Sequence, residues 1–157
     1  MAVNVEFPTT LSNCKIKIPC ATSDERLEVI KTMAQKTASL YAKLLTSKGH
    51  AERSGSLQFN HYPESFPSAN EVDLFRATLA QNISERLLTS EKSTVRLKTR
   101  YIPEDCLGEI LEKCDISPRN YPRDFHKYFP YHIYTQISLD IQSKVFEMKI
   151  EYLPPSI

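Results

Sequence analysis

The segment YHIYTQISLDIQSKVFEMKIEY, residues 131–152, decides the fold because each of its halves alternates apolar and polar residues. Alternate side chains of a β-strand point to the same face, so each half predicts a strand with one apolar face. If Asp140 and Ser143 flank the turn, the residues of the two apolar faces lie opposite one another, which predicts a β-hairpin. The predicted pairs are Ile137–Phe146, Thr135–Met148 and Ile133–Ile150.

The turn of this hairpin lacks the residues that favour the tightest connection. Ile141 and Gln142 stand where a two-residue primed turn favours Gly or Asn, so we expect a slightly wider loop. A hairpin alone is marginally stable in water, and its apolar face must be covered by helices from earlier in the chain. An unpaired outer edge of the hairpin would allow self-association into a homodimer through an edge strand.

Two long amphipathic helices are predicted, each beginning at a capping box. In residues 22–25 (TSDE) and 68–71 (SANE), hydroxyl and carboxylate side chains can satisfy backbone N–H groups left free at a helix start. Apolar residues at helical spacing follow both boxes, and Gly49 offers a stop for the first helix. These residues are Ile30, Met33, Ala34, Thr37, Leu40, Tyr41, Leu44 and Leu45 in the first helix, and Val72, Phe75, Leu79, Ile83 and Leu87 in the second.

Shorter elements complete the predicted fold. Residues 3–7 and 14–18 alternate before prolines, and residues 94–101 alternate cleanly, which predicts three strands. Pro103 suits the first turn of a short helix that ends near Cys114. Because strands and helices are segregated, we expect an α+β fold: an antiparallel sheet with a C-terminal β-hairpin, packed against two long amphipathic helices and one short helix.

The length of 157 residues favours one domain over residues 1–157. Residues 49–68 hold two of the three glycines and two of the ten prolines, so they predict an unusually long loop. Long loops are either functional or merely mobile, and we interpret this one as mobile and flexible.

Composition points to an ordinary globular protein. The net charge of +1 implies no strong long-range field, so an acidic partner would be attracted only by local clusters of charge. No basic start is followed by an apolar run, and no segment approaches the roughly 18 apolar residues that a membrane helix needs. We therefore expect a soluble, cytoplasmic protein that does not bind membranes.

The four cysteines are Cys14, Cys20, Cys106 and Cys114. Their C-x5-C and C-x7-C spacings match no usual pair of zinc ligands, so we expect reduced thiols in or near the core. The chain has no G-x-S-x-G, C-x-x-C or Gly-rich phosphate loop, and we expect neither a metal nor a cofactor.

Residues 117–134 have the most unusual composition, with six of the fifteen aromatic residues interleaved with cations and histidines. Three prolines keep this segment out of a long helix. Rings and cations together are typical of single-stranded nucleic-acid binders, and Tyr and Arg are also enriched at protein interfaces. The candidate partner-binding residues here are Arg119, Tyr121, Arg123, Lys127 and Tyr128.

The strand predicted at residues 94–101 carries a second cationic group. Arg96, Lys98 and Arg100 lie on one face of it, about 6.6 Å apart, and could hold an acidic strand or an acidic protein. The ordinary alternative is that these charges keep an edge strand soluble.

A catalytic alternative uses the same region. His126 or His132 could act as general base or acid on a ribose 2′-hydroxyl, while Arg96 and Arg100 hold the charge that builds on the phosphate. Such a metal-independent ribonuclease requires the hairpin to lie beside the strand at 94–101.

We expect a non-enzymatic binding protein, of the inhibitor or adaptor kind, that engages an acidic macromolecular partner through residues 117–134 and the cationic face of residues 94–101. The near-neutral net charge favours an acidic protein surface, because dedicated nucleic-acid-binding domains more often have a pI above about 9. Binding of single-stranded nucleic acid remains the alternative.

Overall fold

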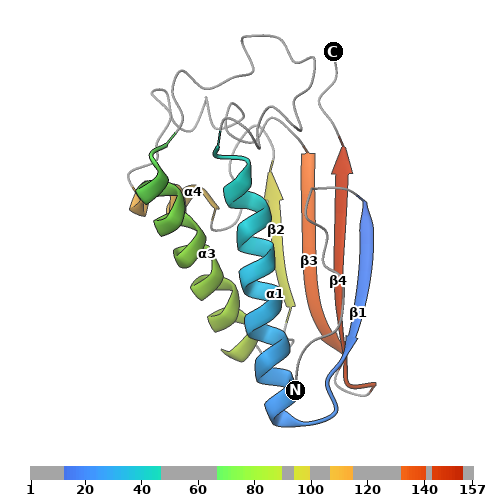
Figure 1. Ribbon diagram of the computed structural model, residues 1–157. Helices are drawn as coiled ribbons and strands as arrows, with labels where there is room; N and C mark the ends of the chain where they lie inside the picture. Colours follow the sequence, from blue (N-terminus) through green and yellow to red (C-terminus); the bar gives the residue numbers. More distant parts are fainter. Residues whose placement is uncertain are drawn as a thin grey trace.

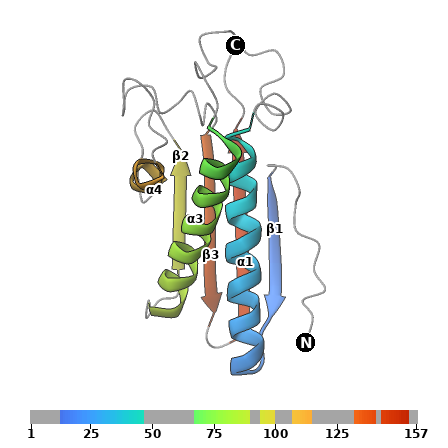
Figure 2. The ribbon, with the colours of Figure 1, turned by 60° about the vertical axis from the view of Figure 1, so that its left-hand side comes forward.

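The computed structural model describes residues 13–46, 67–89, 94–99, 107–114, 132–140 and 143–153. Four strands form one antiparallel sheet, and the two long helices lie together on one of its faces (Figures 1 and 2). The predicted α+β architecture is therefore confirmed. In chain order the elements are β1 (Cys14–Pro19), α1 (Ser23–Lys43), α3 (Ala69–Thr89), β2 (Thr94–Thr99), α4 (Leu107–Lys113), β3 (His132–Asp140) and β4 (Val145–Leu153).

The predicted hairpin forms the centre of the sheet. The strand order is β1-β4-β3-β2, so β1 pairs with one side of the hairpin and β2 with the other. Both outer edges of the hairpin are occupied, so the homodimer through an edge strand would have to form at β1 or β2, and it stays a prediction. Within the described residues the edge strands are β1 and β2. Pro19, which has no N–H to donate, is tolerated because it ends an edge strand.

The register of the hairpin differs from the predicted one by two residues. Because side chains alternate with a period of two, this shift leaves every residue on its predicted face and changes only its partner. The face on which each residue lies was therefore predicted correctly, whereas the cross-strand pairs were not. The observed pairs are Leu139–Phe146, Ile137–Met148 and Thr135–Ile150, in place of Ile137–Phe146, Thr135–Met148 and Ile133–Ile150.

The connection between β3 and β4 selects this register. Asp140 pairs with Val145, so the loop has four residues, 141–144, which confirms the expected wider connection. At its start the Asp140 carboxylate accepts a hydrogen bond from the Ser143 N–H at 3.3 Å. At its end Lys144 has a φ of 54°, the left-handed conformation that reverses the chain.

The core lies between the helices and the inner face of the sheet. Both predicted helical stripes are buried there; on α3 all five stripe residues are 7 % exposed or less. Leu27, at the start of α1, is the exception, because it is 46 % exposed. The strands contribute Ile18, Val95, Leu97, Ile133, Ile137, Leu139, Phe146, Met148 and Ile150.

One buried hydrogen bond joins α1 to the hairpin. The Tyr41 hydroxyl lies 2.8 Å from Oγ1 of Thr135, and the two residues are 0 % and 1 % exposed. One helical turn earlier, the Thr37 hydroxyl points to Sδ of Met148 at 3.8 Å. Because burying a hydroxyl without a partner costs about 1–3 kcal/mol, these contacts set the position of α1 over β3 and β4.

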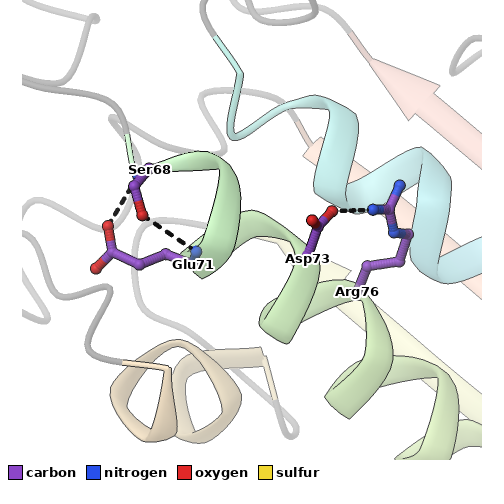
Figure 3. Close-up of polar contacts among 4 residues, drawn as sticks. All are labelled: Ser68, Glu71, Asp73 and Arg76. Carbon is purple, nitrogen blue, oxygen red and sulfur yellow. Dashed lines mark hydrogen bonds and ion pairs between the residues drawn. The ribbon is translucent and has the colours of Figure 1, made fainter.

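The two capping boxes form to different extents. At the start of α3, Ser68 Oγ accepts from the Glu71 N–H at 3.2 Å and the Glu71 carboxylate accepts from the Ser68 N–H at 2.8 Å (Figure 3). In the next turn Asp73 pairs with Arg76. At the start of α1, Thr22 Oγ1 accepts from the Glu25 N–H at 3.1 Å, and within the described residues the reciprocal bond does not form.

The first helix ends at Lys43, earlier than the predicted stop at Gly49. Leu44, Leu45 and Thr46 donate their N–H groups three residues back, which tightens the last turn into the 3₁₀ form. Both leucines are still buried, as the helical spacing predicted.

The short helix α4 begins at Leu107 and buries its apolar residues. Cys114 Sγ points to Thr78 Oγ1 of α3 at 3.9 Å, which joins the end of α4 to α3. The predicted strand at residues 3–7, the start of the short helix at Pro103, and residues 49–66 of the predicted loop lie outside the described residues. No helix in the described part of the chain is long and apolar enough to cross a membrane.

The complete capping box at α3 predicts a measurable loss of stability. We expect Ser68→Ala to lower the free energy of unfolding by about 1 kcal/mol, because it removes the acceptor for the Glu71 N–H. Urea denaturation followed by circular dichroism measures this change. Ser68→Asp is the control, because an Asp side chain can cap the same N–H, and it should stay close to the original stability. Equal losses in both variants would contradict the capping role.

The buried bond between Tyr41 and Thr135 predicts coupled mutations. Tyr41→Phe and Thr135→Val should each lower the free energy of unfolding by about 1–3 kcal/mol, because each leaves a buried hydroxyl without this partner. The double variant should lose less than the sum by at least about 0.5 kcal/mol, since neither hydroxyl then remains. A double-mutant cycle in urea measures the coupling, and strict additivity would contradict it.

Candidate functional site

The candidate site is the outer face of the sheet, the one opposite the helices. No described helix or strand covers it (Figure 2). It carries the polar half of each alternating strand, whose side chains are exposed or half-buried while their neighbours along the strand face the core. We define the open face as the described residues Lys15, Lys17, Thr94, Arg96, Tyr134, Gln136, Ser138, Asp140, Glu147, Lys149 and Glu151.

The sheet register aligns three cations of the open face in one row. Lys15 of β1 lies opposite Lys149 of β4, Lys149 lies opposite Gln136 of β3, and Gln136 lies opposite Arg96 of β2. Neighbouring strands are about 4.8 Å apart, so this row crosses about 14 Å of sheet. The arrangement places positive charge at both margins of the face and on β4 between them.

Two carboxylates offset the repulsion inside this row. Like charges directly opposite each other destabilise a sheet, and Lys15 and Lys149 are such a pair. Lys15 Nζ lies 3.6 Å from Glu147, and Lys149 Nζ lies 2.8 Å from Glu151. The hydrogen bond that Lys149 donates to Glu151, together with the charge of that carboxylate, raises the pKa of Lys149 above the ordinary lysine value.

Arg96 and Lys17 differ from the other cations of the face. Both side chains are exposed, and neither side chain makes a hydrogen bond or an ion pair within the described residues. Lys17 lies opposite Glu147, but that carboxylate is already paired with Lys15. The donors of Arg96 and Lys17 are therefore available to an external acceptor, one at each margin of the sheet.

Tyr134 contributes an aromatic ring to the open face. It is half-buried and lies opposite Glu151 on one side and Lys98 on the other. Its hydroxyl donates a hydrogen bond to Gln136 Oε1 at 2.7 Å, which holds both side chains along β3. Tyr134 is the last residue of segment 117–134, so this segment ends on the open face.

The structure describes only part of the predicted interface. Arg96 is exposed between buried Val95 and Leu97, as the alternation predicted. Lys98 takes its predicted place in β2 by register, and Arg100 follows beyond the described residues. The candidates Arg119, Tyr121, Arg123, Lys127 and Tyr128 also lie outside the described residues, so their meeting with β2 stays a prediction.

The sequence analysis missed three cations of the site, Lys15, Lys17 and Lys149. Their alternation with apolar residues was visible and predicted which way they point. Nothing in the local pattern predicted that β1 pairs with β4, because these strands are separated by more than half the chain. The row across the sheet depends on that pairing.

The hairpin lies beside β2, as the catalytic alternative requires, but three of its four candidate side chains lie outside the described residues. His126 lies outside them, Arg100 follows the described end of β2, and the structure describes the backbone of His132 at the start of β3 but not its side chain. The ribonuclease therefore stays a prediction. Among the described residues no three His, Cys, Asp or Glu side chains gather as a metal site would require.

A small pocket of about 260 Å³ lies where α1 begins, next to the hairpin loop. Cys20 lines it and donates from its N–H and its thiol to the Lys144 carbonyl, at 2.9 and 3.4 Å. Burial raises the pKa of the Cys20 thiol, so it remains neutral at pH 7 and a poor nucleophile. Cys14 and Cys114 are also free thiols, in agreement with the predicted reduced state, while Cys106 lies outside the described residues.

Comparison with known proteins gave no significant match to any family model, curated protein or solved structure.

The Arg96 side chain has no ionic or hydrogen-bonding partner in the described part of the chain, which predicts that it contributes little to stability. Arg96→Ala should change the free energy of unfolding by less than about 0.5 kcal/mol. Leu97→Ala, on the same strand but facing the core, is the control and should cost about 2–5 kcal/mol. Urea denaturation measures both. A loss above about 1 kcal/mol in Arg96→Ala would give Arg96 a structural role instead.

Proposed function

We propose that the protein is a non-enzymatic binding protein that engages an acidic macromolecular partner through its open face and the adjoining segment 117–134. The main observation behind this proposal is which charged side chains of that face already have partners. Its three carboxylates are engaged: Glu147 with Lys15, Glu151 with Lys149, and Asp140 with the Ser143 N–H. Within the described residues, the charges of this face that have no ionic or hydrogen-bonding partner are positive, those of Arg96 and Lys17. A partner that brings acceptors to these two groups replaces their hydrogen bonds to water and breaks no ion pair of the described residues.

The size of the face supports a contribution from segment 117–134. The strands have six residues in β1 and β2 and nine in β3 and β4, so the face covers about 14 Å across and about 25 Å along the strands, or about 350 Å². A stable protein interface uses about 800 Å² on each partner, so the open face supplies less than half of it. Segment 117–134 is the natural extension, since it runs into β3 and ends on the open face at Tyr134. Its partner-binding residues in this proposal are Arg119, Tyr121, Arg123, Lys127 and Tyr128.

The energetics also require more than the two margin cations. An exposed ion pair contributes about 0.2–1 kcal/mol, so Arg96 and Lys17 together account for about 2 kcal/mol at most. Their main effect is on the rate of encounter and on the orientation of the partner. Most of the affinity therefore comes from contacts of the rings in segment 117–134, and the charges of the open face select an acidic partner.

Reversing the margin charges should abolish capture of the partner. We expect Lys17→Glu with Arg96→Glu to lose, in a pulldown from an extract of the native host, the macromolecules that the original protein retains. The control is Lys31→Glu with Lys36→Glu, two exposed lysines of α1. This control variant changes the net charge by the same amount, but on the side of the sheet that the helices cover. It should retain the same macromolecules as the original protein.

Two results would count against this proposal. Equal capture by the open-face variant and the α1 variant would move the interface elsewhere, and equal loss would make the effect one of net charge. The segment is tested separately by Arg119→Ala with Tyr121→Ala, which should weaken capture without changing the net charge of the open face. Unchanged capture by this variant would restrict the interface to the sheet.

A further inference from the structure

The distribution of charge over the open face distinguishes between classes of acidic partner. The margins, β1 and β2, carry cations on the open face, whereas β4 carries two carboxylates and one cation. Along β4, Glu147 lies two residues before Lys149 and Glu151 lies two residues after it. Any partner that reaches from Lys17 to Arg96 must pass over this strand.

A nucleic acid fits this distribution poorly. A phosphodiester chain carries a negative charge at every nucleotide, so a strand that spans from Lys17 to Arg96 places phosphates over Glu147 or Glu151. The repulsion acts at contact distance, well inside the Debye length of about 8 Å at physiological salt, and is therefore only weakly screened. Glu147 and Glu151 also pair with Lys15 and Lys149, so the charges of these two lysines are already offset and attract a phosphate less than Arg96 and Lys17 do.

The aromatic content of the open face also disfavours a nucleic-acid partner. Binders of single-stranded nucleic acid stack successive bases on several rings. Among the described residues of the open face Tyr134 supplies a ring, and its hydroxyl is tied to Gln136 at 2.7 Å. The rest of this surface offers hydrogen-bonding and charged groups, which suit the mixed polar surface of a protein.

We infer that the partner of the open face is a protein surface with separate carboxylates for Arg96 and Lys17, about 15 Å apart, and donor groups between them over β4. This inference rests on the proposed function and names the class of its partner. Lysine, arginine or amide side chains of the partner would meet Glu147 and Glu151, while its carboxylates meet the two margin cations. Such a pattern of both signs fixes the orientation of a protein partner and rejects a polyanion.

A photo-crosslinker at the centre of the face tests this class directly. Benzoylphenylalanine placed at Gln136, between Lys149 and Arg96, is irradiated in native-host extract with its nucleic acids intact, and the adducts are identified by mass spectrometry. The matched control carries the same group at Lys36 on α1. We expect protein adducts at the Gln136 position, absent from the control, whose crosslinked peptides contain both acidic and basic residues.

A second arm removes the two carboxylates of β4. In Glu147→Gln with Glu151→Gln the yield of the protein adduct should fall about two- to fivefold, the effect of losing exposed ion pairs. A nucleic-acid partner would show the opposite change, a higher yield. The purified original protein should also give no saturable anisotropy change with a fluorescent 16-nucleotide oligo-dT at about 50 mM salt, where non-specific binding is strongest.

The outcomes separate this inference from the proposed function. Nucleotide adducts at Gln136, a rise in yield after Glu147→Gln with Glu151→Gln, or tight oligo-dT binding would overturn the protein partner while leaving an acidic partner in place. Adducts to a second copy of this chain, or to a protein peptide without acidic residues, would also overturn it. Absence of any adduct specific to Gln136, together with unchanged capture by Lys17→Glu with Arg96→Glu, would overturn both.

Discussion

The packing of α1 against the inner face of the central hairpin is the constraint on which the rest of the structure depends. Tyr41 and Thr135 share a fully buried hydrogen bond, and Thr37 reaches Met148 one turn away. Apolar contacts alone would allow the helix to slide along the sheet, but a buried hydroxyl pair has one satisfactory position. With α1 fixed there and α3 beside it, both long helices lie on one face and leave the other face of the sheet to its polar residues (Figure 2).

The open face is a product of long-range pairing. Its row of Lys15, Lys149, Gln136 and Arg96 comes from β1, β2 and the β3–β4 hairpin, three parts of the chain that lie far apart in sequence and meet only in the folded sheet. Repulsion between the directly opposite Lys15 and Lys149 destabilises the sheet, and the ion pairs of these lysines with Glu147 and Glu151 offset that repulsion. Some charges of the open face therefore stabilise the sheet. Within the described residues Arg96 and Lys17 do not, and in the proposed function these two cations contact the partner.

The proposed binding through an exposed, charged sheet face has consequences for its energetics. No single exposed pair contributes more than about 1 kcal/mol, so affinity must be spread over a wide contact, while the charges govern orientation and encounter. Salt would weaken such binding progressively, since the charges are exposed. The buried Cys20 near the start of α1 takes no part in this scheme, because its raised pKa and its bonds to Lys144 suit a structural contact between the β1–α1 connection and the hairpin loop.

Local sequence patterns determined the elements of this protein and the orientation of their side chains. The period of two in residues 133–150 and the period of 3.6 after each capping box depend only on neighbours in the chain, and so the buried stripe of α3 and the outward side of Arg96 could be predicted. Only the tertiary structure decided the pairs of the hairpin, because registers that differ by two residues bury the same side chains, and the four-residue loop chooses between them. It also decided that β1 joins β4, and hence that Lys15 and Lys17 share a face with Arg96. Alternation tells each strand which side faces the core, but it carries no information about which strand will lie next to it, since that depends on contacts between distant parts of the chain.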